Sequence, residues 1–228
     1  MTTTSIVLGS SGLIGMHLLN ELEKKDTEIV AVMRRSEKNL PKKIIPLVID
    51  FDDFIENGLL PKCDHLYICL GTTIKTAGSK AEFRRIDLDY CLAFAKKAKE
   101  SGASKISVVT SIGANAKSSN FYLQTKGLLE EEIKKLGFDS VCIFQPGLLL
   151  GKRKENRPLE KIGQKISFIM NIFLVGRLRI YKSVKAHDIA HSMANNSLSN
   201  GNRTKSILNY DKSDLQRPNL HFKCLTLP

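Results

Sequence analysis

Residues 111–126, SIGANAKSSNFYLQTK, carry the side chains best suited to chemistry. Tyr122 and Lys126 are four residues apart, so a helix places them on one face. A lysine charge beside a phenol favours the tyrosinate, which makes Tyr122 a candidate proton donor or acceptor. Ser111 follows an apolar run at the edge where open α/β sheets bind ligands, and it could hold a substrate carbonyl. The alternative is that Tyr122 and Lys126 only form a solvated helix face.

A second candidate site is the glycine-rich stretch IVLGSSGLIG, residues 6–15, between an apolar strand and an amphipathic helix. In a dinucleotide site, Gly9 permits the tight turn, Gly12 admits backbone N–H groups to a pyrophosphate, and Gly15 lets the helix pack closely. The alternative is a strand–helix turn without a ligand. The residues predicted to contact a cofactor here are Gly9, Ser10, Ser11, Gly12, Leu13, Ile14 and Gly15.

The end of the next apolar strand indicates which dinucleotide this would be. NAD-binding proteins usually place a carboxylate about 20 residues after the glycines, for the ribose 2′-hydroxyl. This chain has Arg34 and Arg35 there instead. Because guanidinium groups suit a 2′-phosphate, we expect NADP rather than NAD. The alternative is a pair of exposed charges at a strand end.

These residues need a scaffold of alternating strands and helices, and the apolar patterning supplies one. Its near-continuously apolar strands predict an α/β fold of the Rossmann type, a doubly wound and mostly parallel sheet within a single domain, residues 1–228. A small, basic C-terminal substrate lobe is expected at 148–185. The expected strands are 5–9, 28–34, 44–50, 65–70, 105–111, 139–147 and 206–210, and the main helices are 13–25, 81–102 and 120–137.

Several motifs together resemble an atypical short-chain dehydrogenase/reductase, most closely the branch of Tat-interacting-protein-like oxidoreductases. They are LGSSGLIG (8–15), CLGTT (69–73), FRRIDLDY (83–90), VVTSIGANAKSSNFYLQTKG (108–127) and FQPGLLLGKRKENRP (144–158). The resemblance implies a catalytic triad of Ser111, Tyr122 and Lys126. It also implies cofactor contacts near the adenine from Asp50 and Phe51, and near the ribose and nicotinamide from Leu70, Gly71, Thr72, Thr73, Pro146 and Gly147.

Two positions depart from the family pattern. Gln145 stands where this branch commonly has Arg, and Asp87 stands where many relatives have a structural Asn. The resemblance implies an NADP(H)-dependent oxidoreductase that transfers a hydride between nicotinamide and a carbonyl or alcohol. Because some members are better known as cofactor-binding regulators, a non-catalytic NADP(H)-binding protein is the alternative.

The charge of the chain bears on its partners. Its net charge is +12, and segment 152–185 holds ten Lys or Arg against two Glu. Such a segment favours an anionic substrate, nucleic acid or an acidic membrane surface, although a solvated face is the simpler interpretation. Nucleic acid is not favoured, because no aromatic residues alternate with the charges. For the apolar run 166–175, a lid or dimer face is favoured over peripheral membrane contact. We expect a small-molecule substrate and a monomer or homodimer.

The remaining motifs concern compartment and metals. The five cysteines are scattered and odd in number, which indicates reduced thiols. With no secretory signal at the N-terminus, we expect a cytoplasmic protein. The pair His187 and His191 in HDIAH has metal-ligand spacing, but it lacks the glutamate and a third ligand of a zincin site. We therefore expect no metal.

Overall fold

A computed structural model describes residues 3–25, 27–37, 40–150, 184–196 and 203–208. Its centre is a seven-stranded sheet in the order β3-β2-β1-β4-β5-β6-β9, in which all neighbouring strands pair in parallel. This confirms the predicted Rossmann-type fold. The strands are β1 (Thr3–Leu8), β2 (Thr27–Met33), β3 (Ile44–Val48), β4 (His65–Ile68), β5 (Lys105–Val109), β6 (Ser140–Gln145) and β9 (Arg203–Leu208).

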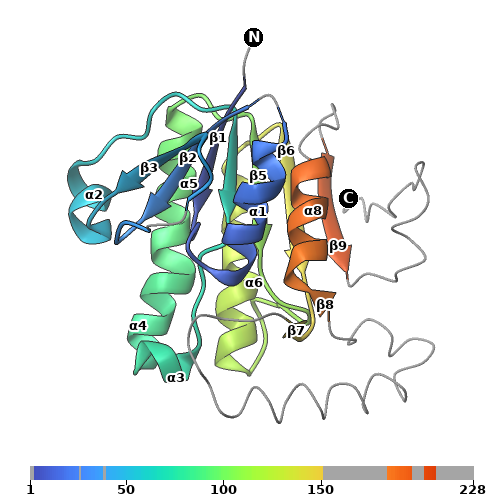
Figure 1. Cartoon of the computed structure of the whole chain (residues 1–228). Helices are drawn as coiled ribbons and strands as arrows, with labels where there is room; N and C mark the ends of the chain where they lie inside the picture. The colour runs from blue at the N-terminus through green and yellow to red at the C-terminus, as the bar shows by residue number, and fades with distance from the viewer. Residues whose placement is uncertain (1–2, 26, 38–39, 151–183, 197–202, 209–228) are drawn as a thin grey trace.

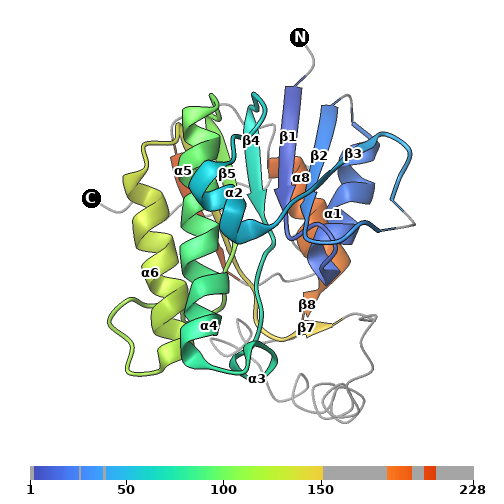
Figure 2. The same ribbon diagram turned by 90° about the vertical axis from the view of Figure 1, so that its left-hand side faces the viewer.

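Helices cover both faces of the sheet (Figures 1 and 2). One face is covered by α1 (Leu13–Glu23) and α8 (Ala186–Asn196), and the other by α2 (Phe51–Asn57), α5 (Cys91–Glu100) and α6 (Phe121–Lys135). The strand residues alternate between the two cores, as the pleat requires. Ile6 and Leu8 of β1 belong to the core under α5 and α6, whereas Val7 belongs to the core under α1 and α8. Burial on both sides explains why the inner strands are nearly continuously apolar, whereas Ile45 and Val48 of the edge strand β3 are exposed.

The helical run expected over residues 81–102 is divided into three consecutive helical segments. It consists of α4 (Lys80–Arg84), a π-helix η1 (Arg85–Tyr90) and α5, one after another. A π-helical turn shifts the register of the side chains that follow it. Here the segment buries Asp87 completely, with none of its surface exposed. Two short helices escaped the sequence analysis, α2 and α3 (Ile74–Ala77).

The predicted C-terminal lobe, 148–185, lies mostly outside the described residues. The structure describes its two ends, where β7 (Leu149–Leu150) pairs in parallel with β8 (Val184–Lys185). The charges from 152 to 182 and the apolar run 166–175 lie outside the described residues, so the role of this segment stays a prediction. In the described part of the chain, every helix is too short or too polar to cross a membrane.

Candidate functional site

The predicted site residues gather at one edge of the sheet. In a parallel sheet the carboxyl ends of all strands meet at the same edge, which is where open α/β sheets bind ligands. Gly9 follows β1, Arg34 follows β2, Leu70 follows β4 and Ser111 follows β5. Pro146 comes directly after β6. The topology therefore brings to one edge segments that are far apart in the sequence.

The glycines of the first turn are required by close backbone contacts. Gly9 has a φ of +79°, and a Cβ there would lie 2.4 Å from the backbone nitrogen of Leu70. A Cβ at Gly15 would lie 2.3 Å from the carbonyl oxygen of Gly9. Neither gap can accommodate a side chain. These contacts press the turn against the segment after β4 and seat the start of α1 on the turn.

The N-terminus of α1 leaves its first N–H groups without a side-chain cap. Gly12 is the N-cap residue, and the first turn contains no acidic side chain. The N–H groups of a first helical turn, which have no partner within the helix, and the helix dipole favour an anion at this position. The Ser10 hydroxyl is not part of this surface, because it is buried and donates a 2.9 Å hydrogen bond to the carbonyl of Val32. Only the backbone of Ser10 can serve a ligand there.

Arg34 and Phe51 form the adjoining part of the site. The Arg34 guanidinium lies 5.9 Å from the centre of the buried Phe51 ring, within the range of a cation–π contact. Arg34 and Arg35 are both exposed at the end of β2. The Asp50 carboxylate has a structural task, since it accepts hydrogen bonds from the N–H groups of Asp52 and Asp53 and caps α2.

Tyr122 and Lys126 lie in the first two turns of α6. The Asn120 side chain caps this helix by accepting a hydrogen bond from the N–H of Leu123. The Tyr122 ring is half-buried and lies 5.5 Å from the fully buried Phe83 ring of α4. Lys126 is 4% exposed, so its ammonium group is enclosed by protein. The pair is therefore not a solvated helix face.

The ammonium group of Lys126 forms a buried ion pair that the sequence analysis did not assign. Its Nζ lies 2.6 Å from Oδ1 of Asp87, and the other carboxylate oxygen accepts a 2.8 Å hydrogen bond from the N–H of Thr72. A Cβ at Gly71 would lie 3.2 Å from Asp87 Oδ1 and 3.3 Å from Lys126 Nζ. The strand end after β4, η1 and α6 thus meet at one carboxylate.

Burial and charge act against each other in this pair. Burial raises the pKa of the Asp87 carboxyl, although Lys126 and the Thr72 N–H oppose the rise. Burial alone would lower the pKa of Lys126, but the Asp87 carboxylate and the nearby Tyr122 outweigh it, so the pKa is raised. Lys126 therefore stays charged at neutral pH. In the sequence, the signals for the pair were a carboxylate between Ile86 and Leu88 and its place where many relatives have a structural Asn.

The loop that carries Ser111 is fastened on two sides. The N–H of Ile112 donates a 2.9 Å hydrogen bond to the carbonyl of Pro146, and the N–H of Asn115 donates to the carbonyl of Leu123 in α6. A Cβ at Gly127 would lie 2.2 Å from the nitrogen of Ala116, so the loop rests directly on α6. The Ser111 hydroxyl itself donates a long bond, 3.4 Å, to the carbonyl of Ile112.

The other two predicted regions have structural contacts as well. Leu70 is partly buried against the turn at Gly9, and the Thr73 hydroxyl caps α3 by accepting a 3.1 Å hydrogen bond from the N–H of Thr76. Pro146 is buried and Gly147 half-buried directly after β6.

The HDIAH pair is part of a contact between two helices. Nδ1 of His191 lies 2.8 Å from Oε2 of Glu21 in α1, and the His187 ring lies 5.7 Å from that of His17. Among the described residues, no cluster of three or more His, Cys, Asp or Glu has the geometry for a metal ion. The histidines therefore connect α8 to α1.

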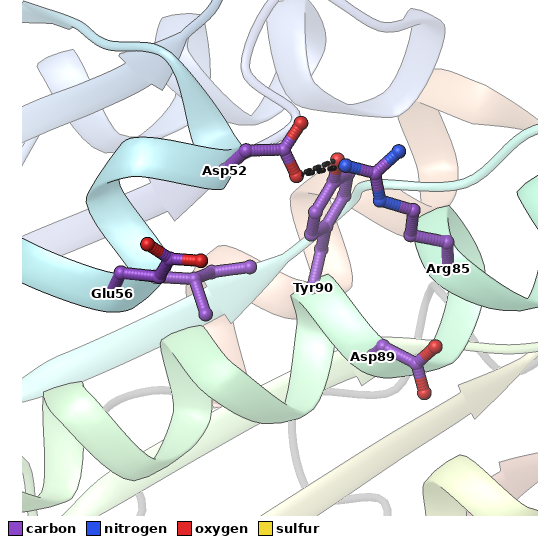
Figure 3. Close-up of a pocket in the computed structure, with 6 residues that line it drawn as sticks. Asp52, Glu56, Arg85, Asp89 and Tyr90 are labelled. Carbon is purple, nitrogen blue, oxygen red and sulfur yellow. Dashed lines mark hydrogen bonds and ion pairs between the residues drawn. The ribbon is translucent and has the colours of Figure 1, made fainter.

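A cavity of about 510 Å³ opens between α2 and η1, lined by Asp52, Ile55, Glu56, Arg85, Asp89 and Tyr90. Figure 3 shows the Asp52 carboxylate facing both the Arg85 guanidinium, with which it pairs, and the Tyr90 hydroxyl, which donates a 2.7 Å hydrogen bond to it. The Tyr90 ring also packs edge-on against Phe51 at 5.5 Å. These contacts tie α2 to η1, and none of the predicted catalytic residues lines this cavity.

The described cysteines are not joined in disulfides. Burial raises the pKa of the Cys63 thiol to about 11 and those of Cys69 and Cys91 to about 12. These thiols therefore stay protonated at neutral pH and are poor nucleophiles.

Curated relatives of this chain include animal and fungal proteins. The protein HTATIP2 of Rattus norvegicus is 35% identical over 165 residues, which cover 70% of this chain and 68% of the relative. The mitochondrial protein FMP52 of Candida albicans is 34% identical over 196 residues, covering 82% and 84%. Further fungal relatives are also named mitochondrial, which contradicts the cytoplasmic location expected from the sequence. The cysteine pattern behind that expectation excludes only an oxidising compartment.

Solved structures share the fold, and several of them carry ligands. One of them, MoeE5 in complex with UDP-glucose and NAD, has a TM-score of 0.64 at 16% identity, covering 90% of this chain and 76% of MoeE5. At this identity the likeness concerns the fold alone. Residues 5–131, from within β1 to within α6, match the NAD dependent epimerase/dehydratase family. The chain belongs to the NAD dependent epimerase/dehydratase family, with an NAD(P)-binding, oxidoreductase-like fold.

Proposed function

We propose that this protein is an NADP(H)-dependent oxidoreductase of the atypical short-chain dehydrogenase/reductase type, acting on a carbonyl or alcohol of a small molecule. The observation that carries the proposal is the position of Tyr122 and the enclosed Lys126 at the same sheet edge as the glycine turn. MoeE5 was solved with UDP-glucose and NAD, which supports a small substrate here. The basic segment 152–185 favours an anionic one.

The residues at this sheet edge fit NADP(H), both its pyrophosphate and its 2′-phosphate. Gly9 and Gly15 leave no room for side chains, and the uncapped start of α1 offers N–H groups for the pyrophosphate. Arg34 and Arg35 would bind the 2′-phosphate, with Arg34 and Phe51 flanking the adenine. Leu70–Thr73, Pro146 and Gly147 would border the ribose and nicotinamide. When bound, NADP(H) supplies or accepts the hydride.

The chain's own groups would handle the carbonyl oxygen and its proton. The Tyr122 hydroxyl would give a proton to the oxygen during reduction and take it back during oxidation. The positive charge of Lys126 would stabilise the tyrosinate, and the same ammonium would hold the ribose. Ser111 would donate a hydrogen bond to the carbonyl oxygen, after turning away from the carbonyl of Ile112.

One observation favours the alternative, a non-catalytic NADP(H)-binding regulator. The ammonium of Lys126 is committed to Asp87 at 2.6 Å, so part of its charge is neutralised. A lysine held in this way would assist the ionisation of Tyr122 less than a free one. It could still contribute to cofactor binding, and the two functions therefore differ in turnover rather than in affinity.

Turnover with a panel of carbonyl substrates separates the two functions. For the enzyme, Tyr122→Phe should lower NADPH oxidation by about 10²- to 10⁴-fold, the usual contribution of a general acid, with NADPH affinity unchanged. The phenyl ring retains the contact with Phe83, so the fold is preserved.

A wild-type protein that binds NADPH and oxidises it with no member of the panel would favour the regulator. Equal turnover by the wild type and the Phe variant would remove Tyr122 from the mechanism.

A further inference from the structure

A buried carboxylate on α6 has no part in the reaction proposed above. Glu130 is 6% exposed. Its Oε1 accepts a 2.5 Å hydrogen bond from the Thr110 hydroxyl, and the Gln145 side-chain amide donates to Oε1 at 2.9 Å and to Oε2 at 3.0 Å. Carboxylates are rarely buried without a cation in contact, and here the contacting donors are neutral.

The partners of Glu130 are neighbours of the proposed catalytic residues. Thr110 directly precedes Ser111, and Gln145 directly precedes Pro146. Glu130 lies four residues after Lys126, which lies four after Tyr122, so the three share one face of α6. One carboxylate thus connects the helix that carries Tyr122 and Lys126 with the strand ends that carry Ser111 and Pro146.

The backbone joins the two strand ends without this help. The N–H of Thr110 donates a 2.8 Å hydrogen bond to the carbonyl of Phe144, and the N–H of Ile112 donates to that of Pro146. On the side of the helix, the loop contacts α6 through the Asn115 N–H and the close approach at Gly127. Glu130 adds side-chain hydrogen bonds that fix the distance from the helix to both strand ends.

The donors around Glu130 favour the ionised carboxylate. The Gln145 amide donates to both carboxylate oxygens, and the Thr110 hydroxyl donates to Oε1 at 2.5 Å, nearer than its other acceptor, the carbonyl of Phe144 at 3.4 Å. Burial opposes this and raises the pKa of Glu130, against the pull of those two donors and of the more distant Lys134 and Lys126. Burying the Glu130 carboxylate costs stability, and the contacts that it makes in the fold must offset that cost.

We infer that Glu130 is a positioning residue, which holds Tyr122 and Lys126 on α6 in register with Ser111 after β5 and Pro146 after β6. The inference rests on the proposed function for its catalytic consequence. Its structural part, that Glu130 fixes the Ser111 loop against α6, can be tested without turnover. A misplacement of about 1 Å in such a constellation can lower a rate by about 10²-fold.

The test compares Glu130→Gln with Gln145→Glu and with the double variant that exchanges the two side chains. Glu130→Gln should lower kcat by about 10- to 100-fold, with KM and NADPH affinity little changed, because binding groups remain. The exchanged pair restores an amide facing a carboxylate and should recover most of the lost kcat. The matched control is Glu131→Gln, the same substitution at an exposed position of the same helix.

Amide hydrogen exchange on the same variants supplies the second readout. Glu130→Gln should accelerate exchange in residues 111–116, while exchange in β1 and β4 stays as in the wild type. Unchanged kcat and unchanged exchange in Glu130→Gln would overturn the inference. Faster exchange throughout the sheet, or no recovery in the exchanged pair, would overturn it too, because Glu130 would then be only a stabilising core residue.

The experiment distinguishes a failure of the proposed function from a failure of the positioning role of Glu130. If the wild type shows no turnover, the proposed function fails, and exchange alone decides the role of Glu130. Faster exchange confined to 111–116 would then support the positioning role, and its absence would contradict it.

Discussion

Asp87 is the residue that most changes the interpretation of the site. A lysine four residues after a tyrosine indicated a charge available to the phenol, but the structure gives that charge a partner at 2.6 Å. The same carboxylate accepts a hydrogen bond from the N–H of Thr72, in the segment proposed to border the nicotinamide. Asp87 therefore fixes Lys126 and the Leu70–Thr73 segment relative to each other.

Removing one member of this pair should be costly. Asp87→Ala leaves the Lys126 ammonium buried without a counter-charge, so the free energy of unfolding should fall by about 3–5 kcal/mol. Adding Lys126→Met removes the stranded charge and should recover much of the loss. Urea unfolding of the three proteins measures both effects, and a double variant no more stable than Asp87→Ala would contradict this account.

The pair also has a defined pH dependence. The pKa of Lys126 in the folded chain is raised above its ordinary value of 10.5. The stabilisation by the charged lysine is thus complete below that ordinary value and is lost as the pH rises through the raised pKa. At neutral pH Lys126 is therefore charged.

Among the elements, β4 holds a buried group whose charge state matters to stability. Its first residue, His65, is 6% exposed, stacks on the Tyr67 ring at 3.9 Å and lies 2.9 Å from the Ser107 hydroxyl of β5. Burial, with a smaller effect of Lys105, lowers the pKa of His65 from 6.5 to about 3. The folded chain therefore keeps this imidazole neutral.

This lowered pKa predicts sensitivity to acid. Between 6.5 and about 3 the unfolded chain binds a proton at His65 that the folded chain does not. The wild type should thus lose about 1.4 kcal/mol of unfolding free energy per pH unit below 6.5, relative to His65→Gln. Urea unfolding between pH about 7 and about 5 measures the difference in slope. Equal slopes for His65→Gln and the wild type would refute the argument.

For the whole molecule, patterns local in the sequence were predicted well. The glycine turn, the alternation of strands and helices and the gathering of Gly9, Arg34 and Ser111 at one sheet edge all follow from periodicity and parallel topology. The structure and the family match confirm this fold. The predicted cytoplasmic location was wrong. The cysteine pattern distinguishes an oxidising from a reducing compartment, but it does not distinguish one reducing compartment from another.

The partners of buried polar groups could not be predicted in this way. Asp87 and Lys126 meet because η1 turns the aspartate inward, and Glu130 meets Gln145 because α6 packs under the end of β6. Such pairings depend on tertiary packing, which a single sequence does not encode as a local pattern. The short helix α2 was not predicted either, although its N-cap residue, Asp50, is visible in the sequence.

The central claim is an NADP(H) site at the carboxyl edge of the sheet, and a fluorescence titration with NADPH and NADH tests it most directly. We predict tighter binding of NADPH by about tenfold or more, as expected for charged hydrogen bonds to a 2′-phosphate. Joint substitution of Arg34→Ala and Arg35→Ala should abolish that preference, whereas Lys62→Ala, an exposed residue before β4, should keep it. Equal affinity of the wild type for the two cofactors would contradict the claim.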